Sequence, residues 1–190
     1  MKTKDIIFAI VSGLLVAWLA VDFLGKIGFI FFIIFPIMSV AGLWFCDWLG
    51  KKYPFIRQSG RFFLVGSFAD VIDIKIFQFL FWIAPFSLFF KGISFLVATI
   101  VKYWWNKNWA FEKNGNDSIK KEILQFFSIT LIGLGINIVS FYFFSKINIR
   151  LPNHLWQEIC IILAALVSAT WNFLGYKFLV FTKPKIMTDN

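Results

Sequence analysis

The sequence predicts an all-α, multi-pass membrane protein whose last four helices form two repeated hairpins. Three observations support this prediction. First, the 190 residues are 59% hydrophobic and 21% aromatic but only 15% charged, whereas about a quarter of the residues in soluble domains are charged. Second, apolar runs of roughly 18 residues or more, the length that crosses a bilayer, occupy most of the chain. Third, two pairs of sequence stretches repeat in register with these runs.

Apolar periodicity and helix-breaking residues divide the chain into about six predicted transmembrane helices. The first follows "MKTKD" and is too long for the apolar region of a signal peptide, so we interpret it as an uncleaved anchor. Gly25 and Lys26 end it, and Pro36 lies inside the second helix, where transmembrane helices tolerate proline. Pro85 separates the third helix from the fourth, and "NIRLPNH" separates the fifth from the sixth. The predicted spans are residues 6–24, 27–49, 62–83, 88–109, 122–145 and 155–179.

The distribution of Lys and Arg predicts that both termini are cytoplasmic, because positive residues accumulate on that side of a membrane. The opposite side carries only Lys26, Lys146 and Arg150, with Lys91 just inside a helix. The net charge of +9 is therefore interpreted as orientation and contact with anionic membrane lipids, and no nucleic-acid partner is expected. The predicted cytoplasmic side carries most of the positive residues: Lys2, Lys4, Lys51, Lys52, Arg57, Arg61, Lys107, Lys113, Lys120, Lys121, Lys177, Lys183 and Lys185.

Three regions are expected: a transmembrane hairpin with its connection (1–56), a four-helix membrane domain (57–183) and a cytoplasmic tail (184–190). The four-helix domain contains two repeats, about 61–113 and 125–183. "RFFLVGSFADVID" from Arg61 aligns with "QFFSITLIGLGIN" from Gln125, and "VKYWWNKNWAFEK" aligns with "WNFLGYKFLVFTK" seventy residues later. Both copies begin and end on the predicted cytoplasmic side, so they are parallel repeats. Such repeats are a common plan of transporters, with binding sites between the halves.

Two carboxylates lie inside the third predicted span. Asp70 and Asp73 are three residues apart and share one face of the helix, while Lys75 points elsewhere. A charge at the bilayer centre costs about 2.5–3.5 kcal/mol on insertion scales, so it normally faces a partner or a watery cavity. An internal ion pair, a shallow and hydrated position, and a functional polar cavity would each explain the two residues.

Polar residues also recur near the ends of both hairpins. Ala98, Lys102 and Asn106 form a stripe with steps of four on the fourth span, and Ser168, Asn172 and Tyr176 occupy the matching positions of the sixth. Asn137 aligns with Asp73 in the second repeat. Lys102 either snorkels to the interface or contributes to a basic pocket for lipid headgroups. The same two interpretations apply to Lys107 and Lys177.

No pattern for catalysis or metal binding stands out. Trp104, Trp105 and Trp109 are interpreted as an interfacial aromatic belt. His154 is the only histidine, so neither a metal site nor a cofactor is predicted. Cys46 and Cys160 lie in apolar segments and are read as core residues rather than a disulfide. The chain is therefore not expected to be an enzyme.

The repeat resembles the GtrA-like family of small membrane proteins. "RFFLVGSFADVID" is similar to the aromatic-rich opening of that family, and the hairpin endings resemble its "NF…N-R-x-W-x-F" pattern. The resemblance covers about residues 57–183. This sequence has Lys102 where the family tends to carry Asn, and it adds two spans before the family's four. Those spans would cover a dimer seam, dock a partner enzyme or serve as an anchor. The matching residues are Asn106, Lys107, Trp109 and Phe111 in the first copy, and Asn172, Phe173, Lys177 and Phe181 in the second.

The resemblance implies translocation of a polyprenyl-phosphate-linked sugar across the bacterial cytoplasmic membrane, for cell-surface polysaccharide synthesis or glycosylation. On this hypothesis, Arg61, Lys102, Lys107 and Lys177 bind the lipid phosphate. The polar sugar path comprises Asp70, Asp73, Asn106, Asn137, Asn172 and Tyr176. The aromatic portal comprises Trp105, Trp109, Phe111 and Phe181. Four repeat helices make a thin wall, which is compatible with a homodimer.

Two alternatives remain at the level of sequence. A non-transporting membrane subunit would use the same features to bind and orient a membrane glycosyltransferase, and the added N-terminal hairpin favours this alternative. A small ion or drug transporter would instead depend on Asp70 and Asp73, while the basic ends would serve only topology.

Overall fold

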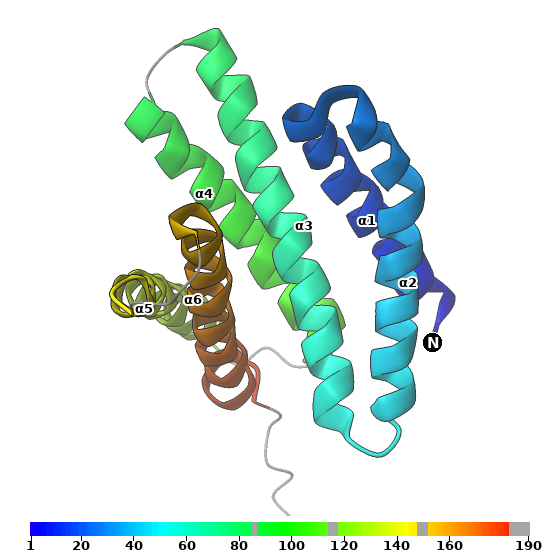
Figure 1. Ribbon diagram of the computed structural model, residues 1–190. Helices are drawn as coiled ribbons and strands as arrows, with labels where there is room; N and C mark the ends of the chain where they lie inside the picture. Colours follow the sequence, from blue (N-terminus) through cyan, green and yellow to red (C-terminus); the bar gives the residue numbers. More distant parts are fainter. Residues whose placement is uncertain (85–86, 114–117, 148–151, 183–190) are drawn as a thin grey trace, which may run out of the picture. The chain divides into compact units, whose positions relative to one another are not determined.

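The computed structural model describes residues 1–84, 87–113, 118–147 and 152–182, and all the regular secondary structure within them is helical (Figure 1). The six α-helices correspond in order to the six predicted ones. Both repeats end in a short π-helix. The elements are α1 (Thr3–Leu24), the 3-10 helix η1 (Gly25–Ile30), α2 (Phe31–Leu49), α3 (Pro54–Ile83), α4 (Ser87–Trp105), the π-helix η2 (Asn106–Ala110), α5 (Ile119–Ser145), α6 (Asn153–Gly175) and the π-helix η3 (Tyr176–Val180). The predicted breaker Pro85 and part of "NIRLPNH" lie outside the described residues.

Four helical stretches in the described part of the chain are long and apolar enough to cross a membrane: Thr3–Leu49, Leu88–Ala110, Ile119–Ser145 and Ile159–Val180. The first of these contains both α1 and α2. The helix α3 is 30 residues long, which is sufficient to cross, but it carries five charged side chains. The chain is thus a multi-pass membrane protein. Its number of spans and its orientation stay predictions.

The helix α3 begins eight residues earlier than the sequence pattern predicts. Pro54 stands in its first turn, where the fixed φ of proline suits a helix and its missing N–H removes no hydrogen bond. Arg57 and Arg61 therefore lie on α3 instead of in a connection. Arg57 pairs with Asp47 at the end of α2, with Nε 2.6 Å from Oδ1.

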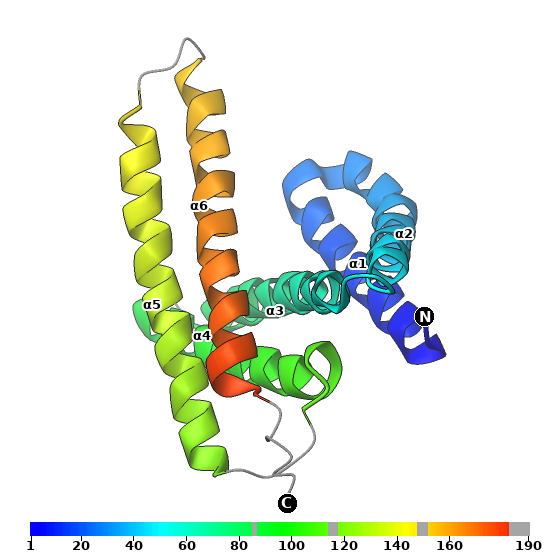
Figure 2. The ribbon, with the colours of Figure 1, turned by 90° about the horizontal axis from the view of Figure 1, so that it is seen from below.

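The chain forms two compact units, Met1–Glu112 and Lys113–Asn190. In the first unit, α1 packs against α2, α3 packs against α4, and α3 also contacts α1 and α2. The residues of the core at the centre of this unit are Phe8, Ala9, Leu43, Val65 and Trp109. The N-terminal hairpin and the first repeat therefore share one core. In the second unit α5 and α6 lie side by side (Figure 2).

The α1–α2 hairpin depends on a close approach between two helices. A Cβ at Gly13 of α1 would lie 2.6 Å from the Cα of Pro36 in α2, so only glycine fits. Small residues allow such approaches in membranes, where lipid is as apolar as the helix surface and packing contributes much of the association energy. Gly13 therefore sets the spacing between α1 and α2.

Equivalent aromatic contacts occur in the two hairpins. Phe62 and Phe126 are 64 residues apart in sequence, and Phe111 and Phe181 are 70 apart. The rings of Phe62 and Phe111 are 6.5 Å apart between centroids, and those of Phe126 and Phe181 are 6.1 Å apart. In both hairpins the third turn of the first helix thus packs against the residue that follows the π-helix.

Candidate functional site

The two π-helices occupy equivalent positions in the repeats, Asn106–Ala110 and Tyr176–Val180, with an offset of 70 residues. Each closes with a hydrogen bond from the residue after it to a carbonyl five residues earlier. The N–H of Phe111 donates to Asn106 at 2.9 Å, and that of Phe181 donates to Tyr176 at 2.7 Å. π-Helical turns are rare and concentrate at functional sites. The sequence repeated at the two hairpin ends therefore corresponds to a repeated and unusual backbone conformation.

A buried cation caps the first π-helix. Arg61 is 3% exposed, and its Nη1 donates to the carbonyl of Trp109 at 3.1 Å and to Glu112 at 2.7 Å. Its Nη2 lies 3.3 Å from Asp5 Oδ2, and the indole of Trp109 donates to the same carboxylate at 2.8 Å. The last carbonyls of a helix lack intrahelical partners, and Arg61 supplies one. The guanidinium is thus bound by protein groups, and we do not assign the lipid phosphate to it.

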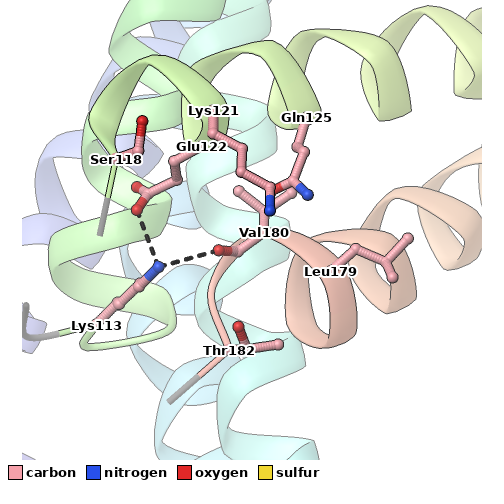
Figure 3. Close-up of a pocket in the computed structure, with 8 residues that line it drawn as sticks. All are labelled: Lys113, Ser118, Lys121, Glu122, Gln125, Leu179, Val180 and Thr182. Atoms are coloured by element: carbon pink, nitrogen blue, oxygen red, sulfur yellow. Dashed lines mark hydrogen bonds and ion pairs between the residues drawn. The ribbon is translucent and has the colours of Figure 1, made fainter. Parts of the chain in front are cut away.

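The second π-helix is capped in the same manner by a residue that sequence reasoning assigned only to topology. Lys113 Nζ donates to Glu122 at 3.0 Å and to the carbonyl of Val180 at 3.2 Å (Figure 3). Both members of this ion pair are buried, at 3% and 2% exposure. Lys113 precedes the second repeat, and Glu122 follows it nine positions later, in the first turn of α5. No helical spacing could have indicated the pair.

A cleft of about 210 Å³ opens beside this ion pair (Figure 3). Lys121 and Gln125, at the start of α5, line it together with Thr182 and with Ser118, the residue that precedes α5. Its ionisable lining consists of Lys113, Lys121 and Glu122. Because Glu122 neutralises Lys113, Lys121 supplies the remaining positive charge.

The first repeat carries a polar row along α4. Lys91 and Ser94 extend the predicted stripe of Ala98, Lys102 and Asn106, with steps of three or four residues. Asp73 of α3 accepts hydrogen bonds from Lys91 at 2.5 Å and from Ser94 at 2.6 Å. The internal ion pair considered for Asp73 is therefore present, and its partner is Lys91.

Asp70 belongs to the same row. It is exposed and interacts electrostatically with half-buried Lys102 of α4. Asn106 is fully buried; its Nδ2 donates to the carbonyl of Lys102 at 2.9 Å, while its Oδ1 has no hydrogen-bond partner among the described residues. Lys75 points away from this row, as predicted, and pairs with Asp22 of α1 at 2.6 Å.

The equivalent row in the second repeat is buried and uncharged. Tyr176 is fully buried, and its hydroxyl lies 2.6 Å from that of Thr130. Ser168 donates to the carbonyl of Gly133 at 2.8 Å. Asn172 packs against the same glycine, and its Oδ1 is buried with no partner in the described part of the chain. Asn137 is half-buried on α5. This row mainly holds α5 and α6 together.

Two predicted phosphate-binding lysines have matching surroundings. Lys107 Nζ lies 5.7 Å from the centroid of the Tyr103 ring, one turn earlier, and Lys177 Nζ lies 5.9 Å from that of Phe173. Both lysines are half-buried. A cation over an aromatic face is attracted by the ring quadrupole, so each π-helix presents its lysine in the same manner.

The residues predicted as an aromatic portal are mostly interior. Trp109, Phe111 and Phe181 are 3–4% exposed, and only Trp105 is half-buried. The Trp105 ring lies 4.4 Å from that of Phe8. The structure gives all four a packing role within their units. Among the described residues, no group of three His, Cys, Asp or Glu side chains could hold a metal ion.

Comparison with known proteins identifies one family. The sequence model described as "GtrA/DPMS, transmembrane domain" matches residues 61–181, which covers both hairpins and both π-helices and leaves α1 and α2 outside. No curated protein and no solved structure matches the chain.

Proposed function

The chain belongs to the GtrA/DPMS transmembrane family, and from this premise we propose that it carries a polyprenyl-phosphate-linked sugar across a bacterial cytoplasmic membrane. The family consists of membrane proteins that handle glycosyl carrier lipids and are generally non-catalytic. The step from handling such a lipid to moving it across the bilayer is our proposal.

The observation that carries the proposal is the polar row of the first hairpin. From Lys91 to Asn106 it runs 15 residues along α4 and η2, or about 22 Å at 1.5 Å per residue. This is most of the roughly 30 Å thickness of the hydrocarbon core. Asp73 and Asp70 of α3 face this row at successive turns. The hairpin thus supplies polar groups over a distance that a translocated headgroup must cover.

Such groups are needed because a sugar is costly to place in hydrocarbon. Each hydroxyl without a partner costs about 4–8 kcal/mol on cyclohexane scales. Asp70, exposed on α3, is an acceptor that sugar hydroxyls would use. The Oδ1 of Asn106 is a second acceptor that is buried and has no partner among the described residues. The prenyl chain would remain in lipid while only the head crosses.

The lysines at one end of the row suit the phosphate. Lys102 lies in the last turn of α4 and Lys107 lies in η2, and both are half-buried. Basic groups between helices at the cytoplasmic interface are a known means of holding anionic headgroups. Lys177 occupies the equivalent place in the second hairpin. We assign the phosphate to Lys102 and Lys107, the pair on the first hairpin.

Transfer of a fluorescent polyprenyl-phosphate sugar between the leaflets of sealed proteoliposomes tests this proposal. The wild type should exceed protein-free liposomes, and Lys102→Ala/Lys107→Ala should lower the rate at least tenfold. Lys120→Ala is the control, because this lysine is exposed at the start of α5, outside the row. It should leave transfer unchanged.

The contrary outcome separates transport from binding. If the folded wild type moves no substrate with any sugar tested, the transport proposal is wrong. The N-terminal hairpin, which lies outside the family match, would then point to a subunit that orients a membrane glycosyltransferase.

A further inference from the structure

A second cleft, of about 250 Å³, lies within the first unit where α1, α2 and α3 meet. Each helix contributes one serine: Ser12 of α1, Ser39 of α2 and Ser67 of α3. The remaining lining is apolar and comes from Val16, Phe35, Met38 and Leu64. Two of the three helices belong to the hairpin that precedes the family match.

Ser12 makes this cleft unusual. Its side chain is 1% exposed, and its hydroxyl has no hydrogen-bond partner among the described residues. Several other helical hydroxyls bond to a carbonyl of the preceding turn, as Ser67 does to Phe63 and Thr99 does to Phe95. Buried polar groups normally have partners. The Ser12 hydroxyl is therefore available to hydrogen-bond a group that the described part of the chain does not supply.

The chemistry of the lining restricts that group. None of the seven lining side chains is ionisable, so a charged ligand would find no counter-charge inside an apolar stretch. A plain hydrocarbon chain would leave the Ser12 hydroxyl unsatisfied. A lining of three serines, one aromatic ring and aliphatic groups suits a neutral ligand with hydroxyls at its edge and an apolar face. A pyranose ring has both features.

The volume limits the size of the ligand. One water takes up about 30 Å³ of liquid, so the cleft holds far more than a single water. It lies just below the range of about 300–1,000 Å³ that is usual for small-molecule pockets. A single sugar ring fits this volume better than an oligosaccharide does.

We propose that this cleft binds one neutral sugar residue, with Ser12 and Ser39 hydrogen-bonding to its hydroxyls and Phe35 against its apolar face. That the sugar is the head of a lipid-linked substrate rests on the proposed function. The added hairpin would then give this chain its sugar selectivity, while the family domain handles the carrier lipid.

The test measures binding to the full-length protein in nanodiscs. The probes are citronellyl-phosphate-glucose, its mannose and galactose analogues, citronellyl phosphate without sugar, and methyl glucoside. The wild type should bind at least one sugar-bearing lipid more tightly than citronellyl phosphate. Ser12→Ala/Ser39→Ala should reduce that difference about fivefold to tenfold, the usual value of one or two hydrogen bonds. Affinity for citronellyl phosphate should not change.

Controls distinguish a sugar site from ordered water. Ser59→Ala removes a half-buried serine of α3 that bonds to Ile56 and does not line the cleft, and it should keep wild-type selectivity. Binding of methyl glucoside that depends on Ser12 would show that the cleft recognises the sugar without its lipid. If Ser12→Ala/Ser39→Ala keeps the sugar preference and only shifts the melting temperature, the cleft holds water and the inference is wrong.

The two proposals fail separately. Serine-dependent sugar binding without transfer between leaflets would overturn the proposed transport and leave the cleft assigned. If transfer has the same sugar preference in Ser12→Ala/Ser39→Ala as in the wild type, the sugar assignment of the cleft is wrong and the transport proposal stands.

Discussion

At the scale of single residues, the positively charged side chains at the hairpin ends differ in burial, and composition does not reveal this difference. Arg61 and Lys113 are each 3% exposed and are held by buried carboxylates and π-helix carbonyls. Lys102, Lys107 and Lys177 remain half-buried. Positive charge on the predicted cytoplasmic side thus serves two purposes, capping the hairpin ends and, on our proposal, holding a phosphate.

Replacing Arg61 tests whether the buried cations stabilise the fold. Arg61→Ala leaves the carboxylate of Asp5 buried without its ion-pair partner, and losing one member of a buried pair costs about 3–5 kcal/mol. Arg57→Ala is the matched control on the same helix, because Arg57 is 40% exposed in its pair with Asp47, and such pairs contribute about 0–1 kcal/mol. Unfolding in detergent should show this difference, and equal losses would contradict it.

Glu112 gives the Arg61 network a defined pH dependence. Burial acts to raise the pKa of Glu112, but the Arg61 guanidinium and nearby Lys2 and Lys4 outweigh it, so the pKa falls below its ordinary value of 4.5. Its contribution to stability is therefore complete above pH 4.5 and is lost as the pH falls through the lowered pKa.

Melting temperatures of the wild type and Glu112→Gln should consequently differ by a constant amount near neutral pH. The two should converge as the medium is acidified below about pH 4. A difference that stays the same at every pH would show that Glu112 contributes through packing alone.

At the scale of elements, apolar runs and helix breakers predicted the six helices. A chain in lipid must satisfy its backbone hydrogen bonds internally, and a helix does so. The same pattern misplaced the start of α3, since hydropathy cannot distinguish the polar residues 57–61 ("RQSGR") from a loop. It also could not show that both hairpins end in π-helices. The repeated residues indicated a shared feature, but the hydrogen-bond register depends on local packing that the spacing does not encode.

The α1–α2 hairpin provides a test with an internal control. Gly13→Ala forces a Cβ against the backbone of Pro36 and should cost about 1–3 kcal/mol, as overpacking does. Gly42→Ala, on the partner helix, meets nothing within 4 Å, so it should be neutral or stabilise by up to about 1 kcal/mol. Unfolding of both variants in detergent checks this, and similar values would refute the close helix crossing.

At the scale of the whole molecule, sequence reasoning predicted the membrane class, the family and the repeat, but not how the repeats differ. The pattern suggested equivalent halves, with Asn137 and Asn172 in place of Asp73 and Lys102. The structure shows a charged, partly accessible row in the first hairpin and a buried, uncharged row in the second. Which side chains meet across a helix pair depends on rotation about the helix axes, which the alignment does not fix.

The measurement that tests the central claim most directly compares equivalent positions of the two hairpins in one assay. Leaflet-to-leaflet transfer of the labelled polyprenyl-phosphate sugar would be measured for Asp73→Asn and Lys102→Ala, and for Asn137→Ala and Asn172→Ala. The account predicts that the first two variants lose at least nine-tenths of the rate, while the folded members of the second pair retain most of it. Loss in the second pair with full transfer in the first would contradict it.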